Sequence, residues 1–308
     1  MVDSVVSQTQ PRTRLRRGTH IAGLAVWRAC FEALKNIVSS TKSSHPIPLL
    51  VAHDSVSVHV FDAHRCAIAH LVLEVETTNL APQTRHRLVV HADLFATALR
   101  MAKEENDVTL SFDADGKTLV LREVATNAAG GTSVVETELS LLDDDVAEPP
   151  SIGEEDLARF PVAIDLQLSL LREIVDCADR AEIGAPTLDL SVTRRVISPS
   201  EVVNHLMFSV LGDEGKLKRR FRFDTIHVDA DDAGMINLDE AASVAHGGDA
   251  TQQVVASSIA VKYLAPFVKS LQSQAIRILC GVRMPVFITY PISEQSRFTI
   301  LVMARLAD

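Results

Sequence analysis

Hydrophobic residues recur at three- and four-residue spacing in four segments of the chain, which is the pattern of a helix with one apolar face. The four segments are residues 24–38, 92–103, 165–181 and 257–272. In the first segment the apolar stripe consists of Leu24, Trp27, Phe31, Leu34 and Val38. This spacing predicts a helix that packs the stripe against a core.

The other three segments carry further local signals. The apolar positions of the second are Leu94, Ala98, Leu99 and Ala102. The third opens at Asp165, a residue type that caps helix N-termini well. The fourth contains Pro266, which has no backbone N–H to donate, so we expect that helix to bend or to start late.

Shorter runs that alternate in polarity or are continuously apolar follow each helical segment, as strands do. These runs are residues 55–61, 66–75, 107–124, 187–192, 205–212, 275–282, 285–292 and 298–306. Within residues 107–124, the pair Asp115-Gly116 predicts the turn of a hairpin. The chain therefore repeats one unit of a helix followed by strands four times, in two pairs.

An acidic segment with a proline pair, residues 138–156, lies between the two pairs and reads as an exposed linker. We therefore predict an N-terminal domain over residues 1–137, of which 1–11 are expected to be mobile, and a C-terminal domain of similar build over 157–308. The predicted fold class is α+β, with helices on one face of curved antiparallel sheets.

The composition narrows the function classes. The 308 residues carry a formal net charge of −10, so the chain would bind nucleic acid only through basic residues gathered on one surface. Its cysteines form no C-x-x-C pair and are expected to be buried apolar residues in a reducing compartment. No apolar run approaches the ~20 residues of a membrane span, and no signal-peptide core opens the chain. We expect a soluble intracellular protein.

The motifs that suggest catalysis are incomplete. Residues 115–118 read DGKT, like the end of a phosphate-binding loop, but they lie in a predicted hairpin. Residues 229–240 match several positions of a calcium loop, yet Ala233 replaces an oxygen ligand and the preceding segment alternates like a strand. The histidines show no zinc-ligand spacing. We predict no catalytic residue, no metal site and no cofactor.

The segment YLAPFVKSLQSQAIRILCGVRMPVFITYPI, residues 263–292, resembles the last helix and following strands of the DNA sliding clamps of the proliferating cell nuclear antigen family. The matching positions are Tyr263, Leu264, Phe267, Lys269, Pro285 and Tyr290. Residues 31–38 with 55–73, and residues 205–215, are similar to two further stretches of that family in the same order. The resemblance extends over about residues 15–306.

The chain also departs from the family pattern. Phe61 and Arg65 stand where the family usually has Met and His. Ile300 and Leu301 stand where tyrosines are usual, and Ala304 where a proline is usual. These positions concern partner binding, so the resemblance implies a diverged clamp.

The resemblance implies a ring of three copies that encircles duplex DNA without sequence preference and tethers other proteins. Its expected partners are a DNA polymerase, other proteins with clamp-binding peptides, and a clamp loader. The expected location is the nucleus, or a viral replication compartment if a virus encodes the chain. Such a ring acts topologically and is not an enzyme.

The helices would line the hole of this ring, and their cations would contact phosphate. Each helix carries one pair of these cations. The two members of a pair lie three to eight residues apart, and the pairs that are seven residues apart share one helix face. The predicted DNA-binding residues are Arg28, Lys35, Arg100, Lys103, Arg172, Arg180, Lys262 and Lys269. The alternative is that these are ordinary solvated helix faces.

Ring closure would pair two edge strands, which we place at residues 116–124 and 216–224. The predicted interface residues are Thr118, Val120, Arg122, Leu217, Arg219 and Phe221. The second segment is rich in Lys and Arg, so the alternative is a charged edge that prevents pairing.

The resemblance also implies an apolar pocket beside the linker for partner peptides with aromatic anchors. Its residues would be Phe61, Ile68, Leu141, Val146, Pro285, Leu301 and Met303. In the alternative interpretation Phe61 fills this pocket and Leu141 belongs to the core.

Three readings of function remain open at this point. The first is a homotrimeric processivity clamp, and the second is one subunit of a heterotrimeric DNA-damage checkpoint clamp. The third is an enzyme whose site converges from distant residues. The mass of the assembly in solution separates the first two.

Overall fold

A computed structural model describes most of the chain between residues 17 and 303. The described residues are 17–21, 23–38, 45–62, 64–78, 83–112, 117–126, 130–160, 162–180, 187–198, 201–211, 218–223, 228–230, 251–272, 274–281 and 284–303. Among these, no helix is both long and apolar enough to cross a membrane.

The described residues of the first half of the chain form nine strands and two long helices. They are β1 (Arg17–His20), α1 (Leu24–Val38), β2 (Pro46–Val51), β3 (Ser55–Phe61), β4 (Ala67–Glu74), β5 (Glu76–Thr78), β6 (His86–His91), α2 (Ala92–Met101), β7 (Asp107–Phe112), β8 (Thr118–Thr126) and β9 (Thr132–Ser140).

The second half repeats this composition after a short linker helix. Its elements are α3 (Glu154–Leu157), β10 (Val162–Gln167), α4 (Leu168–Arg180), β11 (Thr187–Ser198), β12 (Glu201–Leu211), β13 (Lys218–Phe223), β14 (Val228–Ala230), β15 (Thr251–Ala260), α6 (Val261–Ser270), β16 (Ala275–Cys280), β17 (Val286–Pro291) and β18 (Arg297–Val302).

The described strands form three antiparallel sheets. Their orders are β5-β1-β7-β8-β9, β14-β10-β16-β17-β18-β4-β3-β2-β6, and β13-β12-β11-β15. The nine-stranded sheet joins the two halves of the chain because β18 pairs with β4, from Arg297 opposite Val72 to Val302 opposite Ala67. The predicted α+β class with antiparallel sheets is confirmed.

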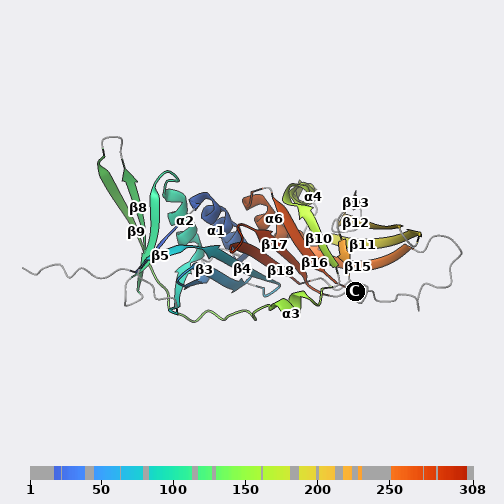
Figure 1. Ribbon diagram of the computed structural model, residues 1–308, viewed down its shortest axis with the longest axis horizontal. Coiled ribbons are helices and arrows are strands. Elements are labelled where there is room, and N and C mark those ends of the chain that lie inside the picture. The colour runs from blue at the N-terminus through green and yellow to red at the C-terminus, as the bar shows by residue number, and fades with distance from the viewer. Residues whose placement is uncertain are drawn as a thin grey trace, which may run out of the picture.

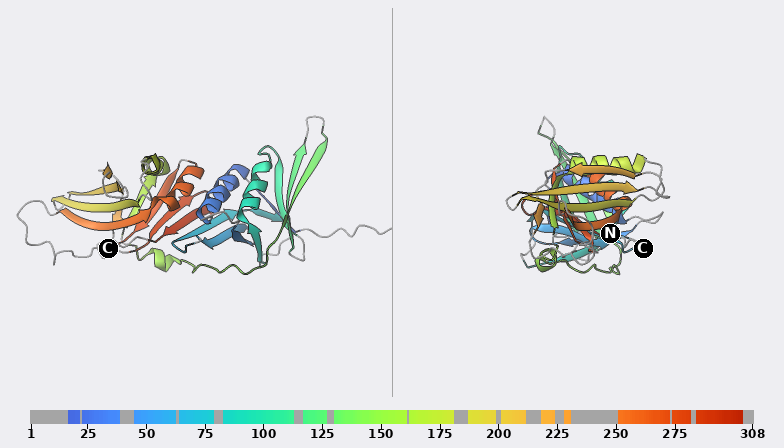
Figure 2. Two further views of the ribbon diagram at one scale, coloured as in Figure 1. Left: turned by 180° about the vertical axis from the view of Figure 1, so that it is seen from behind. Right: turned by 90° about the vertical axis from the view of Figure 1, so that its right-hand side faces the viewer.

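The four long helices lie in a row on one face of the sheets, in the order α2, α1, α6, α4 (Figures 1 and 2). The linker between β9 and β10, with α3, crosses the opposite face. The two faces of the central sheet therefore present different surfaces, one helical and one formed by strands and linker.

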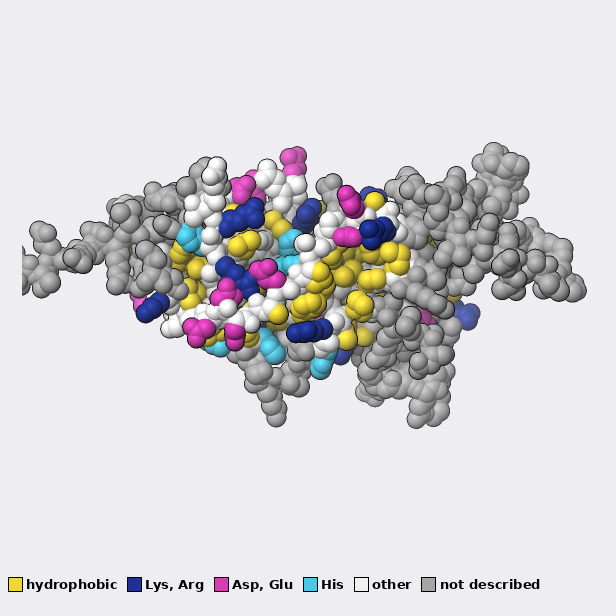
Figure 3. All heavy atoms as spheres, turned by 90° about the horizontal axis from the view of Figure 1, so that it is seen from below, with side chains coloured by type: hydrophobic (Ala, Val, Ile, Leu, Met, Phe, Trp, Pro, Cys, Tyr) yellow, Lys and Arg dark blue, Asp and Glu magenta, His cyan; other side chains and the backbone are white. Residues whose placement is uncertain are grey.

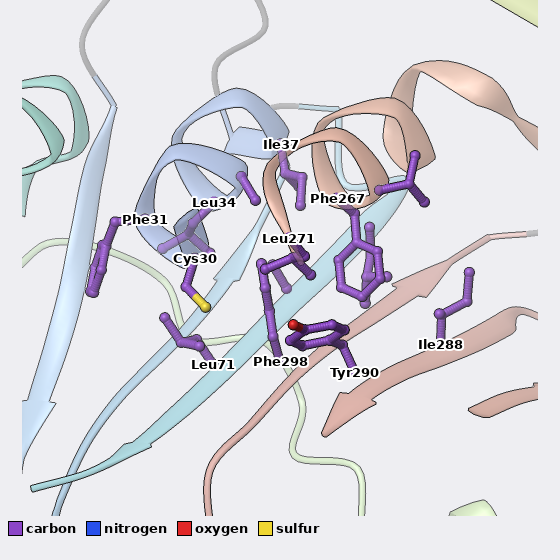
Figure 4. Close-up of a cluster of buried hydrophobic side chains, with 14 of the residues drawn as sticks. Cys30, Phe31, Leu34, Ile37, Leu71, Phe267, Leu271, Ile288, Tyr290 and Phe298 are labelled. Carbon is purple, nitrogen blue, oxygen red and sulfur yellow. The ribbon is translucent and has the colours of Figure 1, made fainter. Parts of the chain in front are cut away.

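The core between helices and strands uses the predicted stripe of α1. All five stripe residues are buried, and the helix has the predicted bounds, Leu24–Val38. Figure 4 shows side chains of α1 and α6 meeting those of the central sheet. The Phe31 ring meets Phe95 edge-on at 4.7 Å between centroids, and Phe267 lies 5.2 Å from Phe298. The core thus continues across both halves of the chain.

The cysteines divide into two groups. Cys30 and Cys280 are buried, and burial raises the pKa of each thiol to about 12, so both pack as neutral apolar groups. Cys177 is half-buried and Cys66 is exposed. The expectation that all four are buried is therefore wrong for Cys66, which lies in the turn between β3 and β4.

One of the four predicted apolar positions of α2 is wrong, whereas Ala98, Leu99 and Ala102 are buried as predicted. Leu94 is 54% exposed, whereas Phe95 is fully buried. The helix begins directly after β6 at Ala92, and positions one, four and eight from there face the sheet, which places Phe95 and Leu99 inward. The fourth helix does start late, at Val261, because β15 continues to Ala260, and it contains Pro266.

The predicted edge at residues 116–124 is not an edge. Strand β8 pairs with β7 on one side and with β9 on the other, so Thr118, Val120 and Arg122 lie on an interior strand. The edge of this sheet is β9, which continues to Ser140, three residues into the predicted linker. An interior strand has no free backbone groups for a second chain, so these three residues are not retained as an interface.

The other predicted edge is correctly placed. Among the described strands, β13 pairs only with β12 and is the last of its sheet. Phe221 packs against the core from this strand. The backbone of Arg219 is part of β13, but its side chain and all of Leu217 lie outside the described residues.

Two arginines cap helix C-termini in equivalent ways in the two halves. Arg28 of α1 donates from Nε to the carbonyl of Leu99 at 2.8 Å and from Nη2 to that of Ala102, the C-cap of α2. Arg172 of α4 donates from Nε to the carbonyl of Val268 at 2.9 Å and from Nη2 to that of Leu271, the C-cap of α6. Each cation thereby satisfies carbonyls that have no partner within their helix.

We expect Arg172→Met to destabilise the protein, because the carbonyls of Val268 and Leu271 lose charged donors while the aliphatic stem is retained. The free energy of unfolding should fall by about 1–3 kcal/mol. Arg100→Met is the control, since Arg100 is exposed and donates only within its own helix, to Thr97; it should change stability by less than about 0.5 kcal/mol. Urea unfolding followed by circular dichroism measures both, and equal losses would refute the capping role.

Candidate functional site

A cavity of about 380 Å³ lies on the sheet face opposite the helices, under the C-terminal part of the linker. Figure 3 shows this face, where hydrophobic side chains gather in the centre with cationic and histidine side chains at their margin. Five neighbouring strands of the nine-stranded sheet, β3, β4, β18, β17 and β16, supply its floor. We call this site the linker groove.

The strand register arranges the floor in two rows that run across the strands. The first row is apolar and consists of Phe61, Ile68, Leu301, Phe287 and Leu279, each opposite the next. The second row is polar and consists of His59, His70, Thr299, Thr289 and Arg277. Side chains two residues apart on a strand share a face, so the rows run side by side about 7 Å apart. All but Phe61 line the cavity.

The linker supplies the roof of the groove. Ile152 and Leu157 line the cavity from above the sheet. The N-terminal half of the linker is fixed by Arg87 of β6, which donates to Asp144 at 2.8 Å, to Glu148, and to the carbonyl of Val146 at 2.6 Å. The backbone N–H of Leu142 adds a hydrogen bond of 2.9 Å to the carbonyl of Val89.

The positive charge at the polar row comes from Arg277 within it and Arg297 beside it, because burial keeps the two imidazoles of the row neutral near pH 7. The rings of His59 and His70 lie 5.0 Å apart, and burial lowers the pKa of both imidazoles. For His70 the pKa falls to about 4, because the positive charges of His59 and Arg297 add to the effect of burial. Arg277 has a carboxylate neighbour, Asp165, at 3.8 Å, and both side chains are half exposed.

The predicted partner pocket overlaps this groove in part. Ile68 and Leu301 line the cavity, and Phe61 continues their row, with the Arg65 guanidinium 5.6 Å from its ring centroid. Of the other predicted residues, Leu141 packs against the core, and Met303 is 53% exposed. The half-buried Val146 and Pro285 do not line the cavity either.

The polar row was missed by sequence reasoning. Each strand alternates, so the signal for His70 beside Ile68, or for Thr299 beside Leu301, was available in the sequence. Their convergence depends on the order of five strands that come from both ends of the chain. That order cannot be deduced from alternation alone.

On the helical face, the predicted DNA-binding residues divide into two classes. Arg28 and Arg172 hold helix C-termini, and Lys35 pairs with Glu32 at 2.7 Å with only 16% of its side chain exposed. These three are therefore structural, because their charged groups already have partners within the helical layer. The side chain of Arg180 lies outside the described residues.

Among the described residues, the exposed cations of this face lie on or just after α2 and α6, the second long helix of each half. They are Arg100, Lys103, Lys262 and Lys269. The Lys262 ammonium lies 4.7 Å from the centroid of the Tyr263 ring, and Lys269 is 3.9 Å from Asp176 of α4. The helical layer therefore presents cations from both halves, with an acidic neighbour at one of them.

No protein-family model matches this chain, and no curated protein matches it. Solved structures do match. The structure of proliferating cellular nuclear antigen from Entamoeba histolytica superposes with a TM-score of 0.66, over 95% of this chain and 100% of that one, at 12% sequence identity. The chain has the fold of a sliding clamp. At this identity the similarity establishes the fold, and the roles of individual residues must come from their geometry.

Two sequence motifs are not placed by the structure. Residues 113–116, which include the start of the DGKT motif, and residues 231–250, which include most of the calcium-loop pattern, lie outside the described residues.

The buried position of His70 in the polar row predicts how its imidazole binds protons and how this affects the stability of the fold. Between about pH 6.5 and pH 4 the unfolded chain binds a proton at this imidazole and the folded chain does not, so this group makes the fold less stable as pH falls through that window. Arg297→Gln removes a like charge and should raise the pKa of His70, whereas Arg159→Gln should not. Titration of the imidazole Cε1–H signals by NMR measures this. An unchanged pKa in Arg297→Gln would show that Arg297 does not act on the polar row.

Proposed function

We propose that this chain is a DNA sliding clamp, three copies of which form a closed ring around duplex DNA and tether polymerases and other replication or repair proteins. The clamp fold supports this proposal. The observation that carries it is that one chain has an acidic edge strand and a basic edge strand at opposite ends of its long axis (Figure 1).

The two edges are complementary in charge. On β9, Glu136 and Glu138 lie two residues apart and are exposed on one face of the strand. On β13, Arg220 and Arg222 are likewise two apart and exposed, while Phe221 between them faces the core. Antiparallel pairing of β9 with β13 of a second copy would place carboxylates opposite guanidinium groups, a favourable cross-strand arrangement.

The acidic edge also exposes apolar surface. Val134 is 47% exposed and Val135 is 56% exposed, and an exposed apolar edge strand is a template for pairing with another chain. Contacts between different edges of identical chains are head-to-tail, and such contacts close into a ring when the rotation between copies permits it. The number of three copies rests on the resemblance to the family.

Reversing the charge of one edge should prevent assembly, and reversing both should restore it. We expect Glu136→Arg with Glu138→Arg, and separately Arg220→Glu with Arg222→Glu, to yield monomers, because like charges would then face each other across each joint. The chain that carries all four changes should again form trimers. Size-exclusion chromatography with light scattering measures the mass.

The control changes two exposed acids in the central part of the chain, Glu155→Arg in α3 with Glu294→Arg in the turn between β17 and β18, which belong to neither edge strand and should leave the trimer intact. If either single-edge variant remains trimeric, the joint does not use these edges. If the fourfold variant stays monomeric, charge complementarity does not hold the joint together.

Contact with DNA would come from the helical face. Arg100, Lys103, Lys262 and Lys269 are distributed over both halves of the chain on the layer that covers one side of the sheet. Phosphate contacts from such residues depend on salt and not on base sequence, which suits a protein that moves along DNA. Retention on DNA would be topological and would require no reaction, so the proposed protein is not an enzyme.

A closed ring can thread over a free DNA end, so linear DNA provides a test of encirclement that requires no clamp loader. The clamp is incubated with bead-bound duplex that has one free end, and the end is then blocked with streptavidin. We expect the clamp to survive a high-salt wash only on blocked DNA and to leave after a restriction cut. Loss in high salt from blocked DNA would contradict encirclement.

The same assay tests the helical face. Changing Arg100, Lys103, Lys262 and Lys269 together to Glu should reduce loading at low salt at least about tenfold, because each lost phosphate contact weakens the electrostatic attraction. The control, Arg85→Glu with Arg159→Glu, changes exposed cations outside the helical layer and should load normally. Equal loading of both variants would exclude the helical face as the DNA surface.

The linker groove is the proposed docking site for partner peptides, including those of a polymerase and a clamp loader. An apolar floor under a linker suits a peptide with apolar anchors. A nuclear location, or a viral replication compartment, follows from the proposed role in DNA replication.

A second candidate is one subunit of a heterotrimeric DNA-damage checkpoint clamp. It is favoured by edge charges that already have partners within the chain: Arg122 lies 3.8 Å from Glu136, and Arg222 contacts His205 at 3.3 Å. A purified chain that stays monomeric at micromolar concentration would support this candidate, and a trimer would support the first.

A further inference from the structure

Two guanidinium groups flank the polar row of the linker groove. Arg277 ends this row on β16, and Arg297 lies two residues before Thr299 on β18, on the same face of the sheet. Strand β17 lies between them and places Thr289 at the centre, opposite both Arg277 and Thr299. Neighbouring strands are about 4.8 Å apart, so both long side chains reach the space above these two threonines.

The groove lining carries no carboxylate among the described residues. Two acids of the linker's N-terminal half, Asp144 and Glu148, bind Arg87 and not the groove arginines. The carboxylate of Asp165 lies beside Arg277 at 3.8 Å but outside the lining, and it is 52% exposed, so it offsets little of that charge. A chain with a net charge of −10 therefore keeps a positive recess on this face.

The neighbouring imidazole reports the same positive field. Burial is the largest cause of the lowered pKa of His70, and the positive charges of His59 and Arg297 add to it, so that part of the shift reflects the cost of a further positive charge here. A negative group at the same place would be favoured for the same reason, and the two threonine hydroxyls would add donors to it.

We propose that the linker groove selects peptides in which an acidic side chain lies about two extended residues from the apolar anchors. The anchors pack on the row that contains Ile68 and Leu301, and the carboxylate binds between Arg277 and Arg297. This inference rests on the proposed use of the groove for partner peptides and names the chemistry of those partners. Rows about 7 Å apart fix the spacing, because two extended residues span this distance.

The apolar row favours a peptide over a nucleic acid as the occupant. A nucleic-acid strand would need a longer track of cations, whereas the described groove has two arginines beside an apolar floor and a roof formed by Ile152 and Leu157. Helices α2 and α6, which carry the exposed cations, lie on the opposite face of the sheets (Figures 1 and 2).

The test uses labelled synthetic peptides of about 16 residues that carry two aromatic anchors in a helical turn. In a series of these peptides, one glutamate occupies in turn each position two, three or four residues before or after the anchors. Each peptide has a counterpart with glutamine at the same position. We expect one glutamate position to bind the full-length protein at least about fivefold more tightly than its glutamine counterpart, as a charge-assisted contact would give. Fluorescence anisotropy measures the Kd values.

Arg297→Gln should abolish the preference for glutamate and leave the affinity for the glutamine peptide unchanged. Arg159→Gln is the charge-matched control, because Arg159 is 72% exposed beside the groove and pairs with Asp156; it should keep the preference. Ile68→Ser should weaken both peptides by at least about tenfold. Together these three results would distinguish a direct contact between Arg297 and the peptide glutamate from the general effect of removing one positive charge.

Lower pH should increase the preference. An anion beside His70 raises the pKa of its imidazole, so the complex takes up a proton and binds more tightly as pH falls from 8 towards 5, while the peptide carboxylate stays ionised. Asp165, Arg277, Arg297 and His59 are the other charged or titratable groups around this position, and Arg297→Gln should flatten the dependence.

Three outcomes would overturn the inference. The first is equal binding of every glutamate and glutamine pair, which would leave the groove a peptide site without acid selection. The second is a preference that persists in Arg297→Gln or is lost equally in Arg159→Gln. The third is the absence of binding by any peptide, which would also count against the proposed docking function, whereas the assembly and threading experiments would still stand.

Discussion

The pairing of β18 with β4 is the contact on which the rest of the structure depends. It joins strands more than two hundred residues apart, and it turns two similar halves into one continuous sheet. The row of helices remains continuous because α1 and α6 meet directly above this joint. The linker groove exists only because the same joint brings Ile68 beside Leu301 and His70 beside Thr299.

Charge is distributed so that each surface has a distinct character. Acids occupy the β9 edge and the linker, and cations occupy the β13 edge, the exposed helical face and the polar row of the groove. Each cationic surface is small, so the whole chain can remain acidic without losing local attraction for anions. The inward arginines, Arg28 and Arg172, belong to none of these surfaces because helix carbonyls already occupy their donors.

Sequence periodicity predicted the helices well because it depends on local packing. The apolar stripe of α1 predicted both ends of that helix, and the late start of the fourth helix follows from β15, with Pro266 inside the helix. In α2 only Leu94 was misplaced, because the start of this helix is set by β6, which alternation cannot show. Strand β9 was missed because its residues are largely exposed, so no buried face gives it a pattern. The capping arginines and the polar row depend on contacts between distant segments, for which a single sequence carries no signal.

The hydrogen bonds of Arg87 divide the linker into two parts, which differ in the free energy needed to separate them from the sheet. Up to Glu148, opening requires the loss of contacts to Asp144, Glu148 and the carbonyl of Val146. Beyond Pro149 and Pro150, the contacts to the groove described above are the apolar ones of Ile152 and Leu157. Local unfolding begins where the fewest contacts must break, so we expect the amide hydrogens after the proline pair to exchange sooner than that of Leu142, with the roof opening while the segment up to Glu148 stays attached.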